Sequence, residues 1–252
     1  MNTLYDMSNQ IEGISFGYRC SSASLLTKKG IRTCSMPFDW LVSRLSVIQH
    51  CIENAFQEFL TVSNYEKKFT KTFYHSNSTD NSQFICDEIV YVNNYYQPLT
   101  NPNPLNTYQY YLGINHRTIT EQEDIEYYKR CISRLDEFLH TPSPHKKIYL
   151  HIAPVMTKED WTVNEQSKLK EAIEFNQFIM TQSVNPLYGV IFFLVLGTTD
   201  ETKILKMKDI ENTKIYIMET NSRFVDGGEC FMGENANEML LINSILDDLI
   251  SF

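Results

Sequence analysis

The sequence VIFFLVL at residues 190–196 is the longest apolar run in the chain, and it decides the fold class. It is far shorter than the roughly 20 residues that a helix needs to cross a membrane. A run of this length suits a strand that is buried on both faces of a sheet. Two similar segments stand on either side of it, KIYLHIA at residues 147–153 and KIYIME at residues 214–219. Residues 189–196 and these two segments are therefore predicted to be strands of one sheet.

Amphipathic segments alternate with these strands. Apolar residues recur at helical spacing in residues 164–180, between the first two strands, and again in residues 235–250, after the third. Continuous apolar strands that alternate with helices are typical of parallel sheets covered on both sides. The predicted fold class is α/β, with a mostly parallel sheet flanked by helices on both faces.

The first half of the chain has a less regular pattern. Residues 43–60 and residues 120 to about 139 show helical spacing, and TEQE at residues 120–123 predicts a capping box. The region between these helices, residues 61–119, is rich in Asn, Ser, Thr, Tyr and Pro, with short strands expected around 88–92 and 108–113. We therefore expect one α/β domain over residues 1–252, with an irregular insertion at 61–119.

Composition and charge exclude several classes of function. Apolar residues make up 42% of the chain, as in ordinary globular proteins, and the net charge is −9. A chain this acidic does not neutralise phosphates over a broad surface, so we expect no nucleic-acid partner. The sequence shows neither a secretory signal nor a membrane span, so we expect no membrane partner and a cytoplasmic location, in the host cytoplasm if the source is a virus.

The cysteines are spaced irregularly. None of the six forms a CxxC pair, which argues against a zinc site, so no metal and no cofactor is expected. In a cytoplasmic chain their default state is the reduced thiol.

One cysteine stands out from the others by its position. The segment GISFGYRC at residues 13–20 predicts a brief strand, a glycine turn and then Cys20 in the first turn of a helix. The positive end of a helix favours thiolate over thiol, and Arg19 adds a positive charge. The backbone amides of Ser21 and Ser22 would then be available to an oxyanion. The alternative is that Cys20 is a small buried apolar residue at a tight turn.

A thiolate mechanism also needs a base, most often a histidine oriented by a carboxylate or an amide. His116 lies in an expected loop, and His75 ends an aromatic, strand-like segment. His151 lies near the carboxyl end of a predicted central strand, where the sites of parallel sheets gather. Asp39, in PFDW at residues 37–40, is the best orienting acid, unless it caps the helix that follows.

Taken together, these residues resemble a known protein family. Its members carry SxGxxC at the end of a strand, an arginine followed by PFDW, a loop histidine, and a helix with spaced arginines. The corresponding segments here are SFGYRC at 15–20, Arg32 with PFDW at 37–40, His116 or His75, and RCISR at 130–134. The family consists of domains of unknown function from bacteria and large viruses that are described as papain-like cysteine peptidases. The resemblance covers about residues 11–140, and the rest more loosely.

The resemblance implies that Cys20 is a nucleophile, that His116 or His75 is its base and that Asp39 is a possible third member. We therefore predict a thiol hydrolase or cysteine peptidase that acts on a peptide, glycan or other small-molecule substrate. The residues predicted to bind this substrate are Arg19, Ser21, Ser22, Arg32, Trp40 and Arg134.

Two other functions compete with this prediction. Members of the resembled family occur beside sugar-polymer enzymes, which favours a metal-independent glycosyltransferase that uses a nucleotide-sugar donor. Its diphosphate would be held by arginine side chains, namely Arg19, Arg32, Arg130 and Arg134. The other alternative is a binding module without catalytic activity.

Overall fold

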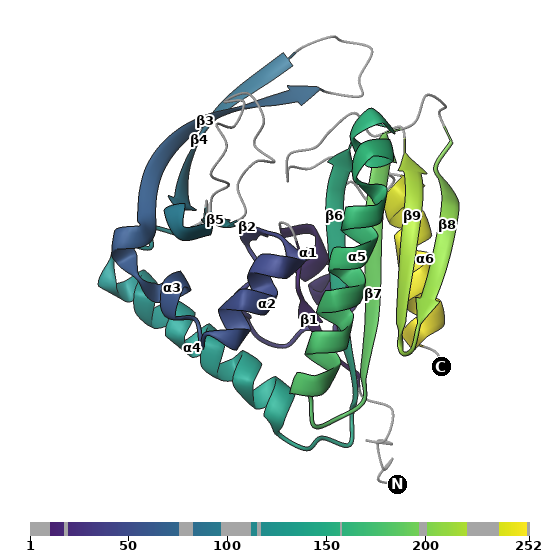
Figure 1. The fold of residues 1–252 in the computed structure, drawn as a ribbon, viewed down its shortest axis with the longest axis horizontal. Helices are drawn as coiled ribbons and strands as arrows, with labels where there is room; N and C mark the ends of the chain where they lie inside the picture. Colours follow the sequence, from purple (N-terminus) through teal and green to yellow (C-terminus); the bar gives the residue numbers. More distant parts are fainter. Residues whose placement is uncertain are drawn as a thin grey trace, which may run out of the picture.

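The computed structural model describes residues 11–17, 20–75, 83–96, 112–114, 117–156, 158–196, 201–220 and 237–250 (Figure 1). Five strands form sheet A, in the spatial order β1-β6-β7-β9-β8. They are β1 (Ile11–Ser15), β6 (Lys146–Met156), β7 (Leu187–Leu196), β8 (Lys203–Ile210) and β9 (Thr213–Thr220). The strands β1, β6, β7 and β9 are parallel to one another, and β8 pairs with β9 in the antiparallel direction. The predicted α/β fold with a mostly parallel sheet is confirmed.

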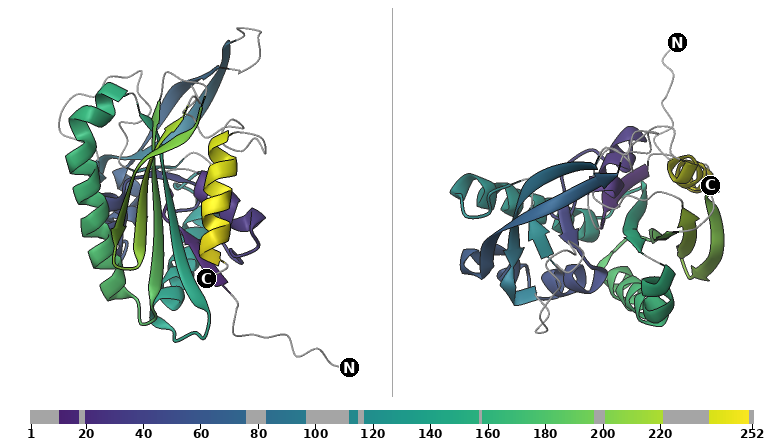
Figure 2. Two further views of the ribbon diagram at one scale, coloured as in Figure 1. Left: turned by 90° about the vertical axis from the view of Figure 1, so that its right-hand side faces the viewer. Right: turned by 90° about the horizontal axis from the view of Figure 1, so that it is seen from above.

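Helices cover both faces of sheet A. The long helix α5 (Lys158–Gln182) lies on one face and α6 (Asn237–Ile250) on the other, as the left view of Figure 2 shows. The helix α1 (Cys20–Lys28) packs into the same apolar cluster as α6. Alternation along β6 explains this arrangement, because successive side chains point to opposite faces. Leu150 belongs to the cluster of α1 and α6, whereas Tyr149 packs in the other cluster with Phe175 of α5.

The insertion predicted to be irregular is largely ordered where it is described. The strands β3 (Tyr65–His75) and β4 (Gln83–Asn93) form a long hairpin. β4 pairs with β5 (Leu112–Ile114), which in turn pairs with β2 (Leu41–Ser43). The result is a second, antiparallel sheet B in the order β2-β5-β4-β3, visible at the upper left of Figure 1. The sequence analysis did not predict this sheet, because pairing between distant segments leaves little trace in local composition.

The helix predicted over residues 43–60 is broken in two. It consists of α2 (Leu45–Glu53) and α3 (Gln57–Leu60). The break occurs where Ala55 and Phe56 have φ values of 51° and 61°, in the left-handed region that ends a helix. The turn returns the Phe56 side chain to the core, where it is 5% exposed. Burial of this aromatic ring offsets the cost of the unusual backbone.

The start of α4 (Gln122–His140) also differs from its prediction. The capping box at residues 120–123 is absent, since Glu121 is the N-cap residue and makes no side-chain hydrogen bond there. Asp124 in the first turn binds the segment before the helix instead, because its Oδ2 accepts a hydrogen bond from the amide of Thr118 at 2.7 Å. Its other oxygen forms an ion pair with Arg117 at 2.6 Å.

The described helices include none that is both long enough and apolar enough to cross a membrane.

Candidate active site

The turn that carries Cys20 connects the carboxyl end of β1 to α1. We call residues 16–22 the cysteine turn. Residues 18 and 19 within it, and with them the predicted ligand Arg19, lie outside the described residues. The turn stands at the edge of sheet A where the parallel strands end, which is where functional sites of such sheets gather.

Both ends of the cysteine turn are bound to β6 by an exchange of hydrogen-bond partners. Phe16 continues the parallel ladder, because its amide donates to the carbonyl of Leu150 at 2.9 Å. In a regular ladder the amide of Ile152 would donate to the carbonyl of Phe16. The Ile152 amide instead donates to Ser22 Oγ at 3.1 Å. The carbonyl of Phe16 accepts its hydrogen bond from Nδ1 of His151.

Two buried serines hold the middle of the turn. The amide of Gly17 donates to Ser15 Oγ at 3.1 Å, and the hydroxyl of Ser43 donates to the Gly17 carbonyl at 3.3 Å. Both serine residues are fully buried. Because buried polar groups that lose their partner cost about 1–3 kcal/mol each, this network favours a single conformation of the backbone at Gly17.

Cys20 is the first residue of α1 and is 7% exposed. The first four amides of a helix have no acceptor within the helix, and those of Ser21 and Ser22 are among them. The first turn of α1 contains no acidic residue, so no carboxylate of that turn competes for these amides. The local geometry fits the predicted surroundings of a thiolate, namely the positive end of a helix dipole.

The structure describes the six histidines unevenly. His116 lies outside the described residues, and only the backbone of His75, the last residue of β3, is described. His50 contacts Tyr96, and His140 contacts Asp136 on the surface. His145 lies near Glu12, beside the beginning of β1. Among the histidines with described side chains, His151 is the one that contacts the cysteine turn.

His151 is uncharged at neutral pH. It is 3% exposed, and burial lowers its pKa from 6.5 to about 4, although the Phe16 carbonyl opposes this shift. A carbonyl oxygen only accepts hydrogen bonds, so the proton of the neutral ring is on Nδ1. Two charged residues of α5 also affect the pKa of this ring: Glu171 raises it and Lys168 lowers it.

The lowered pKa of His151 predicts acid sensitivity. Between about pH 6.5 and pH 4 the unfolded chain binds a proton at this position and the folded chain does not, so stability falls as the pH is lowered through this range. The total loss is about 3 kcal/mol. Urea unfolding at pH 7 and at pH 4 measures this loss. The free energy of unfolding should differ less between the two pH values in His151→Asn than in the wild type. An equal difference in both proteins would show that His151 does not titrate in this way.

Asp39 is fully buried and forms an ion pair with Arg32. Its Oδ2 accepts from Nε of Arg32 at 3.0 Å and from Nη2, and also from the amide of Met36 at 2.7 Å. Burial raises the pKa of Asp39, and the contacts with Arg32 and Met36 lower it in part. Arg32 also donates to Thr27 on α1 at 3.0 Å and lies 5.8 Å from the ring centre of Trp40. In these contacts Asp39 fixes the turn at residues 36–40, and it does not cap α2, whose N-cap residue is Arg44.

This ion pair is expected to be important for stability. Asp39→Asn leaves the Arg32 guanidinium, whose side chain is only 10% exposed, beside a neutral partner. Loss of one member of a buried pair costs about 3 kcal/mol, which urea unfolding will detect. Asp247→Asn is the matched control, because Asp247 pairs with Lys29 at 2.6 Å but its side chain is 62% exposed. That variant should lose less than about 1 kcal/mol. Equal losses in the two variants would contradict this account.

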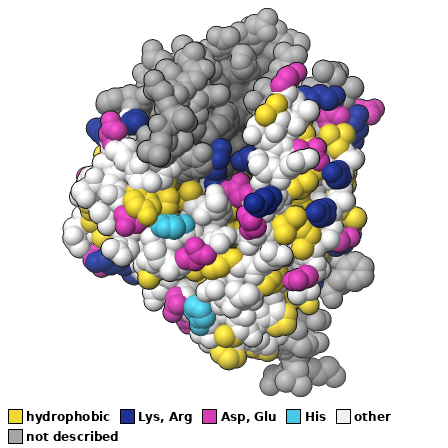
Figure 3. Space-filling model, viewed as in Figure 1, with side chains coloured by type: hydrophobic (Ala, Val, Ile, Leu, Met, Phe, Trp, Pro, Cys, Tyr) yellow, Lys and Arg dark blue, Asp and Glu magenta, His cyan; other side chains and the backbone are white. Residues whose placement is uncertain are grey.

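A group of charged residues lies on the α5 side of the sheet, and the sequence analysis missed it. Glu171 accepts from both the amide and the hydroxyl of Ser46, at 3.0 and 2.6 Å, and so lies at the start of α2. Lys168 is 3.8 Å from Glu171, and burial together with the charge of Arg44 lowers its pKa. Figure 3 shows charged side chains of both signs in the middle of this face. No sequence signal joins residues 46 and 171, which the fold alone brings together.

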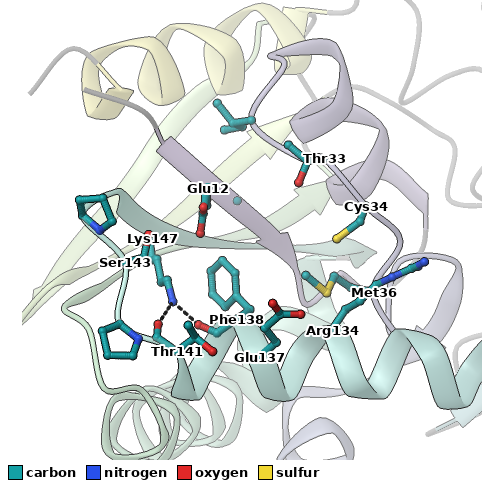
Figure 4. Close-up of a pocket in the computed structure, with 14 residues that line it drawn as sticks. Glu12, Thr33, Cys34, Met36, Arg134, Glu137, Phe138, Thr141, Ser143 and Lys147 are labelled. Carbon is teal, nitrogen blue, oxygen red and sulfur yellow. Dashed lines mark hydrogen bonds between the residues drawn. The ribbon is translucent and has the colours of Figure 1, made fainter. Parts of the chain in front are cut away.

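A cavity of about 330 Å³ lies at the opposite end of β1 and β6, where both strands begin (Figure 4). Lys147 at its wall is 1% exposed and donates to the carbonyls of Phe138 and Thr141, at the end of α4. Arg134, predicted to bind substrate, also lines this cavity and donates to the Ser35 carbonyl at 3.3 Å. Arg134 therefore lies in the wall of this cavity.

One comparison with known proteins gives a family. The sequence model of the family described as "Putative papain-like cysteine peptidase (DUF1796)" matches residues 12–174. The chain belongs to this family. The matched region begins in β1 and ends in α5, so it contains the cysteine turn, the turn at residues 36–40 and all of α4. Neither a curated protein nor a solved structure matches the chain.

Membership in the family supports the general interpretation as a cysteine peptidase. The glycosyltransferase alternative receives no comparable support. Two of the arginines that it requires already have partners in the fold, since Arg32 pairs with Asp39 and Arg134 with the Ser35 carbonyl.

Proposed function

We propose that this protein is a thiol hydrolase of the peptidase class, with Cys20 as its nucleophile. One observation carries the proposal. The thiol begins a helix at the carboxyl edge of a parallel sheet, on a turn whose two ends are bound to the same strand. Such a position combines a stabilised thiolate with nearby amides that have no helical acceptor.

The proposed reaction has two halves. In the first, the Cys20 thiolate attacks the carbonyl carbon of the substrate, and the oxyanion accepts hydrogen bonds from the amides of Ser21 and Ser22. A protonated histidine then gives its proton to the leaving amine, and a thioester remains on Cys20. In the second half, water loses a proton to the same histidine and attacks the thioester, which releases the acid and restores the thiolate.

The position of β5 favours His116 as the base over His75. β5 ends at Ile114, opposite Leu41 of β2, and His116 follows two residues later. β5 thus ends beside β2, which directly follows the turn at residues 36–40 that holds Asp39. The other oxygen of Asp39, Oδ1, is buried and has no hydrogen-bond partner among the residues that the structure describes, and we propose that it orients His116.

His75 is less favoured because of the length of the hairpin. The hairpin is joined to β5 at Tyr91, which pairs with Lys67 of β3. His75 follows eight residues later, at the far end of β3, which corresponds to about 26 Å of extended strand.

A trapped acyl-enzyme tests the proposed function. The protein is mixed with p-nitrophenyl esters of N-acylated amino acids, quenched in acid, digested and analysed by mass spectrometry. We expect an acyl group on the peptide that contains Cys20, removable by neutral hydroxylamine because it is a thioester. An acyl group that resists hydroxylamine, or none on Cys20, would favour a non-catalytic binding module.

A further inference from the structure

The exchange of partners between β1 and β6 has a specific location. It begins at Phe16, the first residue of the cysteine turn, and ends at Ser22, the last. The two groups on β6 that take part, the ring of His151 and the amide of Ile152, belong to adjacent residues. A short loop is thus fixed at both ends to one rigid and buried strand, and Cys20 lies between the two points of attachment.

The residue types match this task. The Ile152 amide donates to Ser22, so the Phe16 carbonyl needs another donor. A buried carbonyl without a hydrogen bond would be destabilising. His151 follows Leu150, the partner of Ser15 at the end of the register, and its imidazole supplies that donor to Phe16. Ser22 is fully buried, so its hydroxyl oxygen is the acceptor that the Ile152 amide has in place of a ladder carbonyl.

We infer that His151 and Ser22 are positioning residues, because His151 attaches Phe16 at the end of β1 to β6 and Ser22 attaches the first turn of α1, which begins with Cys20, to the same strand. The inference rests on the proposed function, since it describes how the nucleophile is prepared. His151 acts through the backbone of the turn, and its role is separate from that of the base. Displacing a reacting group by about 1 Å costs on the order of 10²-fold in rate, so fixing this turn contributes directly to catalysis.

The donor atom of His151 suggests a matched pair of variants. The side-chain amide of asparagine places an N–H close to the position of histidine Nδ1, and leucine fills similar space without a donor. His151→Asn should therefore retain the hydrogen bond to Phe16 that His151→Leu loses. Ser22→Ala tests the other attachment and deletes only a hydroxyl group, so it remains informative if His151→Leu does not fold. His145→Leu, near the other end of the sheet, is the control.

Two measurements test whether His151 and Ser22 have this positioning role. The first is the rate at which iodoacetamide labels Cys20 as a function of pH, with Cys34 in the same molecule as the internal standard. We expect His151→Leu and Ser22→Ala to label Cys20 about tenfold more slowly at pH 7, because its thiolate loses about one pKa unit of stabilisation. His151→Asn and His145→Leu should stay within about threefold of the wild type by the same reasoning. Unchanged rates in both His151→Leu and Ser22→Ala would overturn the inference.

The second measurement is NMR of the unmodified protein and of Ser22→Ala. We expect the His151 ring in its Nδ1–H tautomer, and an Ile152 amide whose slow hydrogen exchange is lost in Ser22→Ala. An Nε2–H tautomer, or an unaffected Ile152 amide, would refute the described attachments. This result does not depend on catalysis. If Cys20 of the wild type reacts no faster than Cys34, the proposed function fails. If Cys20 reacts quickly but equally in all variants, only the positioning role fails.

Discussion

Cys20→Ala should reduce hydrolysis of acyl substrates by on the order of 10⁴-fold or more, because no second nucleophile would replace the sulfur. The substitution removes one atom from a side chain that is 7% exposed, so the fold should be retained with a loss of about 1 kcal/mol. Initial rates of ester and peptide hydrolysis measure the effect, and circular dichroism checks the fold.

Cys34→Ala is the matched control for this prediction. Cys34 is a half-buried thiol on the wall of the cavity at the other end of β1, so its removal should leave the rates unchanged. Activity that survives in Cys20→Ala but is lost in Arg32→Ala would contradict the hydrolase and favour the transferase. Arg32→Ala also breaks the ion pair with Asp39, so its stability has to be measured alongside its activity.

Gly189→Ala should destabilise the protein by roughly 3–5 kcal/mol through overpacking and lost hydrogen bonds. Gly189 lies between Tyr149 on β6 and Thr213 on β9 in the register of sheet A. A β-carbon added there would be 2.3 Å from Cζ of Tyr149 and 2.3 Å from Oγ1 of Thr213. Tyr149 is fully buried, and its hydroxyl donates a hydrogen bond to Oδ1 of Asn176 at 3.0 Å. The ring therefore has little freedom to move aside.

Urea unfolding tests this prediction, with the midpoint expected to fall at an unchanged m-value. Gly30→Ala is a suitable comparison because Gly30 has a φ of +70° but no atom within 4 Å of an added β-carbon. Its cost should be only that of the left-handed backbone, about 1–2 kcal/mol. A loss in Gly189→Ala no larger than that of Gly30→Ala would show that the core around Tyr149 adjusts easily.

The parts of the fold that the sequence predicted are those with local signals. The apolar runs at 147–153 and 190–196 are strands because no other buried element fits their length and composition. The glycine turn and the cysteine at 20 predicted a helix start, which the structure contains. β8 was not predicted, since its exposed edge position leaves it without a continuous apolar pattern.

The parts that escaped prediction are the side-chain contacts that form only in the folded chain. His151 was noted for its place on a strand, but nothing in the sequence indicates that its ring replaces a backbone amide of its own strand. Asp39 and Arg32 were separately proposed as an orienting acid and a substrate ligand, and the structure pairs them with each other. Local sequence specifies which residue types are present, whereas the folded chain determines their partners, as the register of β1 against β6 does for His151.

The central claim is that the thiol at position 20 is ionised at neutral pH because the start of α1 stabilises its charge. The most direct test is the pH dependence of iodoacetamide labelling in the unmodified protein, followed separately for each cysteine by mass spectrometry. The account predicts that the midpoint for Cys20 lies at least one unit below the ordinary thiol pKa of about 8.5. A Cys20 midpoint at or above 8.5 would contradict the account.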